Sequence, residues 1–237
     1  MIEMVRRFLR QRLGSPAMVI ALGILAVLTA MQAAVSNAEQ AFGTGFLAIL
    51  LIGAGAVSKD ASGGALQMIL VRPIRRTSYL FGRYLGILLV FVIYVAAAGA
   101  LTPLIARIVP YPSPGRSASD VSFADLGRGA ASAFLNCLLF AAIILFFSTF
   151  LRGYADVLAL ILLQIVLGLL PQIPQAWVKR AAPVLRDNVL PYVDWREVLR
   201  ASGAMGEPVG RWALAVTVFL VLAALVFSRR EFSYGHD

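Results

Sequence analysis

Histidine and cysteine are almost missing from this chain of 237 residues, which has one of each, His236 and Cys137. Intramembrane serine proteases need a Ser–His pair and zinc proteases need an HExxH motif, and neither can be assembled here. A transition-metal site also needs several His, Cys or carboxylate ligands held close together. A lone cysteine excludes an intrachain disulfide. The residues therefore argue against hydrolytic and metal-dependent enzymes.

A phosphate-binding loop is missing as well. Neither Lys59 nor Lys179 follows a glycine, so the sequence has no GxxxxGK[ST] motif. In that motif the backbone N–H groups of a glycine-rich loop hold the phosphates of a nucleotide. We therefore expect no nucleotide hydrolysis of this kind, and no bound cofactor, on this chain.

Charged residues are scarce, at 14 % of the chain, where soluble domains have about a quarter. Hydrophobic residues make up 60 % and are gathered into runs close to the roughly 20 residues that cross a bilayer as a helix. Runs of this length indicate helices, since a spanning segment must satisfy its own backbone hydrogen bonds. The sequence predicts an all-α polytopic membrane protein, a single domain over 1–237 with about six spans. The predicted spans are 17–35, 41–57, 80–106, 130–151, 157–174 and 212–228.

The N-terminal segment 1–14 has apolar residues at helical spacing with arginines between them. This pattern predicts a helix that lies in the membrane interface, although an ordinary basic flank of the first span is the simpler alternative. A signal peptide is disfavoured because the apolar run after it exceeds the roughly 7–15 residues of such a region. The apolar positions are Ile2, Val5, Phe8, Leu9 and Leu13, and the arginines are Arg6, Arg7, Arg10 and Arg12.

The placement of Lys and Arg predicts the orientation. With an even number of spans both termini share a side with segment 58–83, and that side collects most of the basic residues. The short loop 36–40 on the other side has none. By the positive-inside rule both termini and segment 58–83 are cytoplasmic, and 175–210 is an outer segment. The net charge of +9 then reflects topology and contact with anionic membrane lipids, not nucleic-acid binding.

Polar residues inside the predicted spans are few, and Asn136 and Gln164 are the clearest. No ionisable residue lies near the centre of a span, which argues against a proton- or ion-coupled transporter. For these two amides, hydrogen bonding between helices is the favoured interpretation, and lining of a transport pathway is the alternative.

Segment 58–83 is amphipathic and rich in arginine, and it contains a proline break. An acidic residue, Asp60, is followed by Gly64 four positions later, Pro73 nine further, Arg76 three further and Arg83 seven further, with Leu66 and Leu70 between. This pattern resembles the signature of permeases of the ABC-2 transporter family. The departures from that signature are Asp60 for Glu, Ala65 for Thr or Ser, and Arg83 for Lys.

The resemblance also extends to the layout of an interfacial helix, about six spans and an elaborated outer segment. It implies that 58–79 is a cytoplasmic coupling segment that docks on a separate ATPase subunit, which would bind ATP and Mg²⁺. It also implies a second permease copy or paralogue, and the Ala- and Arg-rich composition suits a bacterial plasma membrane. The coupling residues it implies are Asp60, Gly63, Gly64, Leu66, Leu70, Arg72, Pro73, Arg76 and Arg83.

Two other functions remain open from the residues alone. One is a secondary transporter or channel that works without an ATPase. The other is a noncatalytic membrane scaffold that recruits a cytoplasmic complex through segment 58–83.

Overall fold

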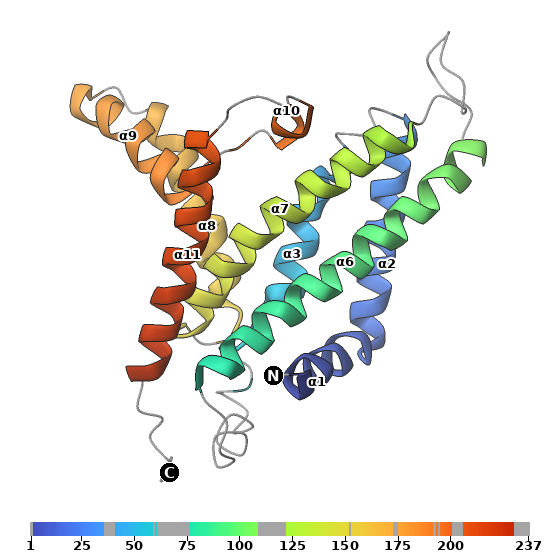
Figure 1. Cartoon of the computed structure of the whole chain (residues 1–237), viewed down its shortest axis with the longest axis horizontal. Coiled ribbons are helices and arrows are strands. Elements are labelled where there is room, and N and C mark those ends of the chain that lie inside the picture. The colour runs from blue at the N-terminus through green and yellow to red at the C-terminus, as the bar shows by residue number, and fades with distance from the viewer. Residues whose placement is uncertain are drawn as a thin grey trace.

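The structure is a computed structural model, and every regular element in its described part is a helix (Figure 1). The described residues are 2–35, 41–58, 60, 76–108, 122–151, 153–172, 175–191, 193, 195–200 and 206–229. Within these ranges five helices are long and apolar enough to cross a membrane. The prediction of an all-α polytopic membrane protein is confirmed.

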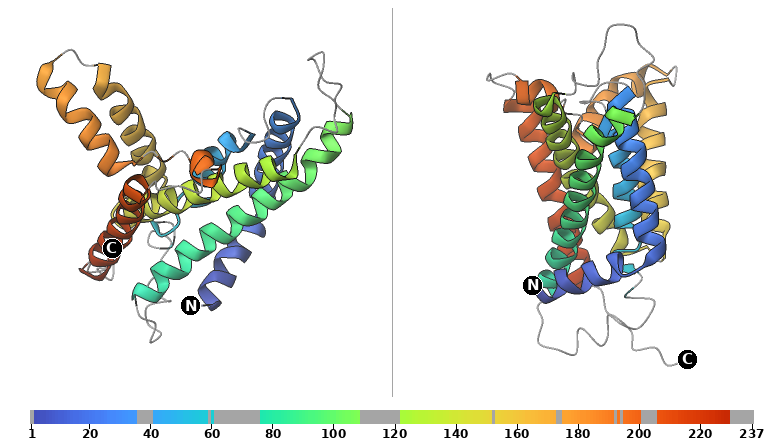
Figure 2. Two further views of the ribbon diagram at one scale, coloured as in Figure 1. Left: turned by 45° about the horizontal axis from the view of Figure 1, so that its top comes forward. Right: turned by 90° about the vertical axis from the view of Figure 1, so that its right-hand side faces the viewer.

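The first helix, α1 (Ile2–Leu13), lies crosswise at one end of the bundle, as Figure 2 shows. It buries Met4, Phe8 and Arg12, whereas Ile2 on the opposite face is 82 % exposed. The segment predicted to lie in the interface is thus an amphipathic helix with one face packed on the bundle. The next helix, α2 (Pro16–Val35), begins at a proline, which is favoured in the first helical turn because it needs no N–H partner there.

The bundle is formed by helices that cross it in alternating directions. The described residues cross the bundle six times, so α1 and the last turn of α11 lie at the same end (Figure 1). After α2, the crossings are η1 (Ala41–Thr44) with α3 (Gly45–Gly53), α6 (Arg76–Ile108), α7 (Phe123–Ser148), α8 (Ala155–Leu169) with η3 (Leu170–Gln172), and α11 (Gly206–Arg229).

The second crossing differs from the prediction of one span over 41–57. Its apolar helical part, Phe42–Gly53, is shorter than the other crossings. The chain turns after Gly53, and Gly55 has φ 65°, a left-handed conformation that a glycine adopts without strain. A Cβ at Gly53 would lie 3.0 Å from the side chain of Ile144, so the helix packs closely on α7. Gly45 likewise allows a close approach, because a Cβ there would lie 3.3 Å from the Phe91 ring, whereas nothing lies within 4 Å of a Cβ at Gly43.

The other crossings have different bounds from the predicted spans. Helix α6 begins before residue 80 because it includes the polar turn that starts at Arg76. Helix α7 begins before residue 130 because it includes the charged pair Asp125 and Arg128. Such amphipathic turns continue a helix beyond the apolar run that reveals it in the sequence.

The predicted outer segment contains two helices, α9 (Ala176–Val189) and α10 (Trp195–Arg200), at the end of the bundle opposite α1 (Figure 1). Helix α10 contacts α7. The Trp195 ring packs edge-on against that of Trp212 in α11, with ring centroids 4.9 Å apart. This aromatic contact connects the segment to the bundle.

A buried polar contact joins three crossings in the interior. The Tyr94 hydroxyl of α6 lies 2.6 Å from the Thr29 hydroxyl of α2 and 3.3 Å from that of Thr44 in η1. Hydrogen bonds of this type between helices are more favourable in an apolar medium than unpaired hydroxyls.

Candidate functional site

The sequence-predicted coupling residues divide into two groups. Asp60, Arg76 and Arg83 belong to the described part of the chain, at the two ends of segment 58–83. The other six lie outside the described residues, namely Gly63, Gly64, Leu66, Leu70, Arg72 and Pro73.

Asp60 and Arg83 form a buried ion pair that joins the two ends of segment 58–83. Their side chains are only 8 % and 3 % exposed. The Tyr79 hydroxyl donates a hydrogen bond to Asp60 Oδ2 at 2.7 Å and accepts one from Arg83 Nε at 3.2 Å. A buried charge pair needs such additional hydrogen bonds to offset its loss of hydration. The segment is thus closed at its base by charges and a hydroxyl.

Helix α1 packs directly on this ion pair. Arg83 Nη1 donates a hydrogen bond of 3.0 Å to Gln11 Oε1, and the Arg83 guanidinium lies 5.2 Å from the Phe8 ring centroid, within cation–π range. Gly86 provides the space for Phe8, because a Cβ at that position would lie 2.6 Å from Phe8 Cδ1. The fit of Phe8 against α6 fixes α1 crosswise under the bundle.

Arg12, also in α1, reaches the turn that follows α3. Its guanidinium donates a hydrogen bond to the carbonyl oxygen of Ala54. Burial lowers the pKa of Arg12, whereas the nearby Tyr154 and Asp156 raise it. Arginine remains protonated despite such shifts, so Arg12 holds a positive charge at the C-terminal end of α3, where the helix dipole favours a cation.

The turn between α7 and α8 supplies acceptors for the same stretch of backbone. Asp156 Oδ2 accepts a hydrogen bond of 2.9 Å from Gly55 N–H. Ser148 Oγ accepts from Val57 N–H and Ser58 N–H at 2.9 and 3.1 Å. Ser148 and Asp156 are fully buried, and they accept hydrogen bonds from backbone N–H groups of the stretch that follows α3, so these buried donors are paired.

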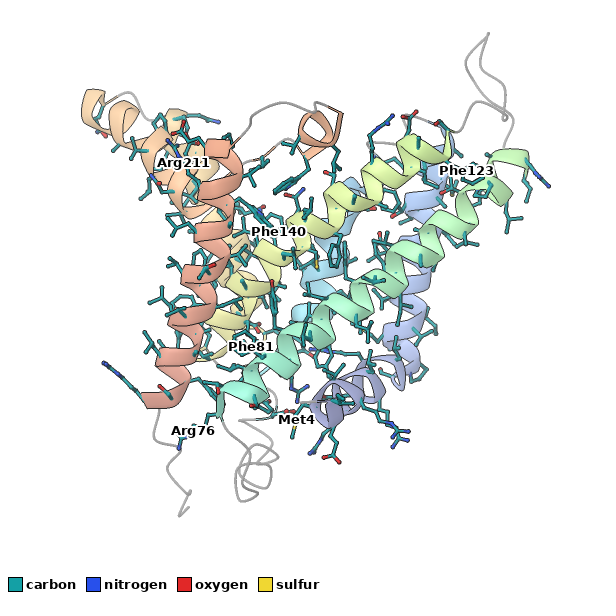
Figure 3. All side chains as sticks on the ribbon, in the orientation of Figure 1. Met4, Arg76, Phe81, Phe123, Phe140 and Arg211 are labelled. Carbon is teal, nitrogen blue, oxygen red and sulfur yellow. The ribbon has the colours of Figure 1, made fainter. Side chains whose placement is uncertain are left out.

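Helix α11 contacts the first turn of α6. The Tyr79 ring stacks on that of Phe227 with centroids 5.7 Å apart, and Arg76 Nη1 donates a hydrogen bond of 2.9 Å to the Ser228 carbonyl oxygen. Figure 3 shows Arg76 and Met4 at this end of the bundle and Arg211 at the other.

We call this set of contacts the polar junction. It joins the base of segment 58–83 to α1, the end of α3, α6, and the α7–α8 turn, while Tyr79 links it to α11. Sequence reasoning identified Asp60 and Arg83 but missed the other members. The charge of Arg12 and of Asp156 within an apolar sequence was the only signal that could have identified further members. The members are Gln11, Arg12, Asp60, Tyr79, Arg83, Ser148 and Asp156.

The two predicted mid-span amides, Asn136 of α7 and Gln164 of α8, line one cavity of about 400 Å³. Both side chains are half-buried. No hydrogen bond joins either of them to another residue in the described part of the chain. Both interpretations of the two amides, hydrogen bonding between helices and lining of a transport pathway, stay predictions.

The crossings and the polar junction define a polytopic helical membrane protein that holds a long connecting segment at its base. Residues 13–232 match the family described as ABC-2 family transporter protein, and the chain therefore belongs to that family. It is a membrane transport component, a permease of the ABC exporter type, and its family implies an ATPase partner. A comparison with curated proteins finds no match.

Proposed function

We propose that this chain forms the translocation path of an ABC exporter and couples it to a separate ATPase subunit through segment 58–83. The observation that carries the proposal is the buried Asp60–Arg83 pair at the base of the segment. ATP and Mg²⁺ would bind to the ATPase, and a second permease copy or paralogue would complete the path.

The polar junction provides a physical route for this coupling. Moving Asp60 away from Arg83 would leave two buried charges without partners, which is strongly unfavourable. A displacement of the segment base therefore moves α6 with it. Because Phe8 and Gln11 contact Arg83, α1 follows as well. A packed cluster of this kind favours discrete rearrangements over gradual deformation.

The experiment that tests the proposal uses the permease co-expressed with its ATPase subunit. We expect the two to co-purify, and the permease to change the rate of ATP hydrolysis. Gly64→Trp should abolish that change and transport while leaving the thermal unfolding of the permease alone unaltered. Gly127→Trp is the matched control, because no atom lies within 4 Å of a Cβ at this exposed position at the far end of the bundle.

Two outcomes would count against the proposal. Transport by the purified chain without any nucleotide-hydrolysing partner would favour a secondary transporter or channel. A bound ATPase whose activity is indifferent to both the permease and Gly64→Trp would favour a scaffold.

The orientation is proposed on the same basis, with both termini and segment 58–83 in the cytoplasm of a bacterial cell. A Cys137→Ala chain offers a background for single cysteines, because Cys137 is the only one. We expect a membrane-impermeant maleimide to label Glu207→Cys in intact spheroplasts, and Ile2→Cys only after lysis. The reverse pattern would place segment 58–83 outside the cell and refute the coupling role.

A further inference from the structure

We propose that the cavity between α7, α8 and the α9–α10 connection is a binding site for a small, uncharged amphiphile that carries a hydroxyl or amide group. Its volume of about 400 Å³ lies within the range of about 300–1,000 Å³ that small-molecule sites occupy. The site needs neither an ATPase partner nor a nucleotide, so the inference goes beyond the proposed function. The lining residues that matter here are Asn136, Phe140, Gln164, Gly168, Leu190 and Pro191.

The chemistry of the lining selects against charge. Among the described residues that line the cavity none is ionisable, and apolar side chains surround the amides of Asn136 and Gln164. A charged ligand would lose its hydration without gaining a counter-ion, which is costly in an apolar site. A hydroxyl or amide, by contrast, can both donate to and accept from the two side-chain amides. A short alkyl chain suits the remaining surface.

Charged side chains are kept in a separate space next to the cavity. Asp187, Glu207 and Arg211 line a smaller pocket of about 210 Å³, which shares Pro191 with the amide-lined cavity. The two pockets differ in chemistry on either side of that proline. An uncharged ligand therefore has a site of its own in the amide-lined cavity.

The cavity is bounded toward the α10 end by Leu190 and Pro191. The chain that continues from them is held by packing of Val193 and Trp195, both buried, and by the edge-on contact of Trp195 with Trp212. Within the described part of the chain neither indole N–H has a hydrogen-bond partner. This boundary rests on apolar packing of the side chains, and neither indole adds a hydrogen bond to it within the described residues.

Asn136 and Phe140 also line a second cavity, which has a volume of about 130 Å³ and lies on the α3 side of α7. The Phe140 ring packs edge-on against that of Phe46, with centroids 5.1 Å apart. Figure 3 shows Phe140 part of the way along α7, between the two ends of the bundle. Asn136 and Phe140 line both cavities, so a ligand that extends from one cavity to the other must pass these two side chains. Asn136 is therefore a candidate specificity-determining residue.

The test is photolabelling of the full-length permease in lipid nanodiscs, without nucleotide. The probe is 3-azioctanol, an eight-carbon alcohol with a photoreactive diazirine, and its charged counterpart is the matching azi-octanoate. Mass spectrometry of the digested protein locates the adducts. We expect saturable labelling by the alcohol on peptides that contain Phe140 or Gln164, and none at those peptides by the carboxylate.

Variants separate this site from general partitioning into the bilayer. Asn136→Leu and Gln164→Leu should each raise the half-saturating concentration about three- to ten-fold, the loss expected for one hydrogen bond. Gly168→Leu should block labelling by filling the cavity, because nothing lies within 4 Å of a Cβ there. Gln32→Leu repeats the Gln-to-Leu change on α2, outside the cavity, and should have no effect.

Three results would overturn the inference. They are unsaturable labelling spread over exposed apolar residues such as Leu158 and Leu162, equal labelling by the carboxylate, and labelling that survives Gly168→Leu. Because the assay has no ATPase, its failure would leave the coupling proposal unaffected, and a failure of coupling would leave this inference intact.

Discussion

Removing one charge from the Asp60–Arg83 pair should destabilise the permease strongly. Asp60→Asn retains an acceptor for the Tyr79 hydroxyl, which lies 2.7 Å from Asp60 Oδ2, so the change removes mainly the negative charge. Arg83, with a side chain only 3 % exposed, is then buried without its counter-ion. Breaking a buried pair in this way typically costs about 3–5 kcal/mol. For a chain of this size the corresponding decrease in Tm is about 6–20 °C.

Removing both charges should be less harmful than removing one. In Asp60→Asn combined with Arg83→Met, no buried charge is left alone, and methionine fills much of the volume of the arginine side chain. Replacement of a buried ion pair by apolar groups is often close to neutral. We therefore expect the double variant to be more stable than either single variant. The coupling energy between the two sites should be about 2 kcal/mol or more.

The assay is thermal unfolding of the purified permease in detergent, completed for all four members of the mutant cycle. Glu207→Gln provides the matched control, because it breaks an ion pair with Arg211 whose side chains are 76 % and 44 % exposed. That exposed pair should contribute less than about 0.5 kcal/mol. A loss below about 1 kcal/mol for Asp60→Asn would show that the pair is solvated, and the reasoning about the polar junction would be wrong.

The same cycle tests function when the ATPase subunit is present. The double variant lacks the ionic link between the base of segment 58–83 and α6 even where its stability is restored. We expect it to remain defective in coupling ATP hydrolysis to transport. Normal coupling in a stable double variant would show that the link is structural only.

Three further changes test the packing around the polar junction and the outer segment, each by thermal unfolding. Gly86→Ala should lower stability by about 1–3 kcal/mol because the new Cβ collides with Phe8. Adding Phe8→Leu should recover part of the lost stability. If it recovers none, the collision is not the cause of the loss. Asp156→Ala leaves the Gly55 N–H without its acceptor and should lower the free energy of unfolding by about 1–3 kcal/mol. Asp156→Asn keeps an acceptor oxygen and should lower it less. Equal losses would contradict the assigned hydrogen bond. Trp195→Phe should be tolerated far better than Trp195→Ala, since the buried indole N–H has no hydrogen-bond partner among the described residues. Similar losses for the two variants would mean that the ring packing is not what holds the segment.

The sequence identified most of the architecture because crossing a bilayer leaves a strong compositional signal. Runs of apolar residues revealed α2, α6, α7, α8 and α11, since each must satisfy its backbone internally across an apolar medium. The amphipathic spacing of residues 1–14 also revealed the helix that lies crosswise. The second crossing was harder to predict, because apolar residues continue from Gly53 into a turn and composition does not mark where that helix ends.

In the candidate site, too, some features of single residues could be predicted from the sequence and others could not. Asp60 and Arg83 belong to a spaced pattern within one segment, so the sequence alone predicted their importance. Their burial against each other depended on how α6 packs with α1, which brings Gln11 within hydrogen-bond distance of Arg83 across 72 positions of sequence. No local pattern encodes a contact of that range.

The sequence by itself determined the class of protein, the family signature of segment 58–83 and the distribution of charge, because these depend on residue type and local spacing. Only the tertiary structure decided which backbone groups Ser148 and Asp156 serve, and that Asn136 and Gln164 share one cavity. The reason is physical: hydropathy acts on each segment separately, whereas polar partners are chosen by the angles and distances at which helices pack.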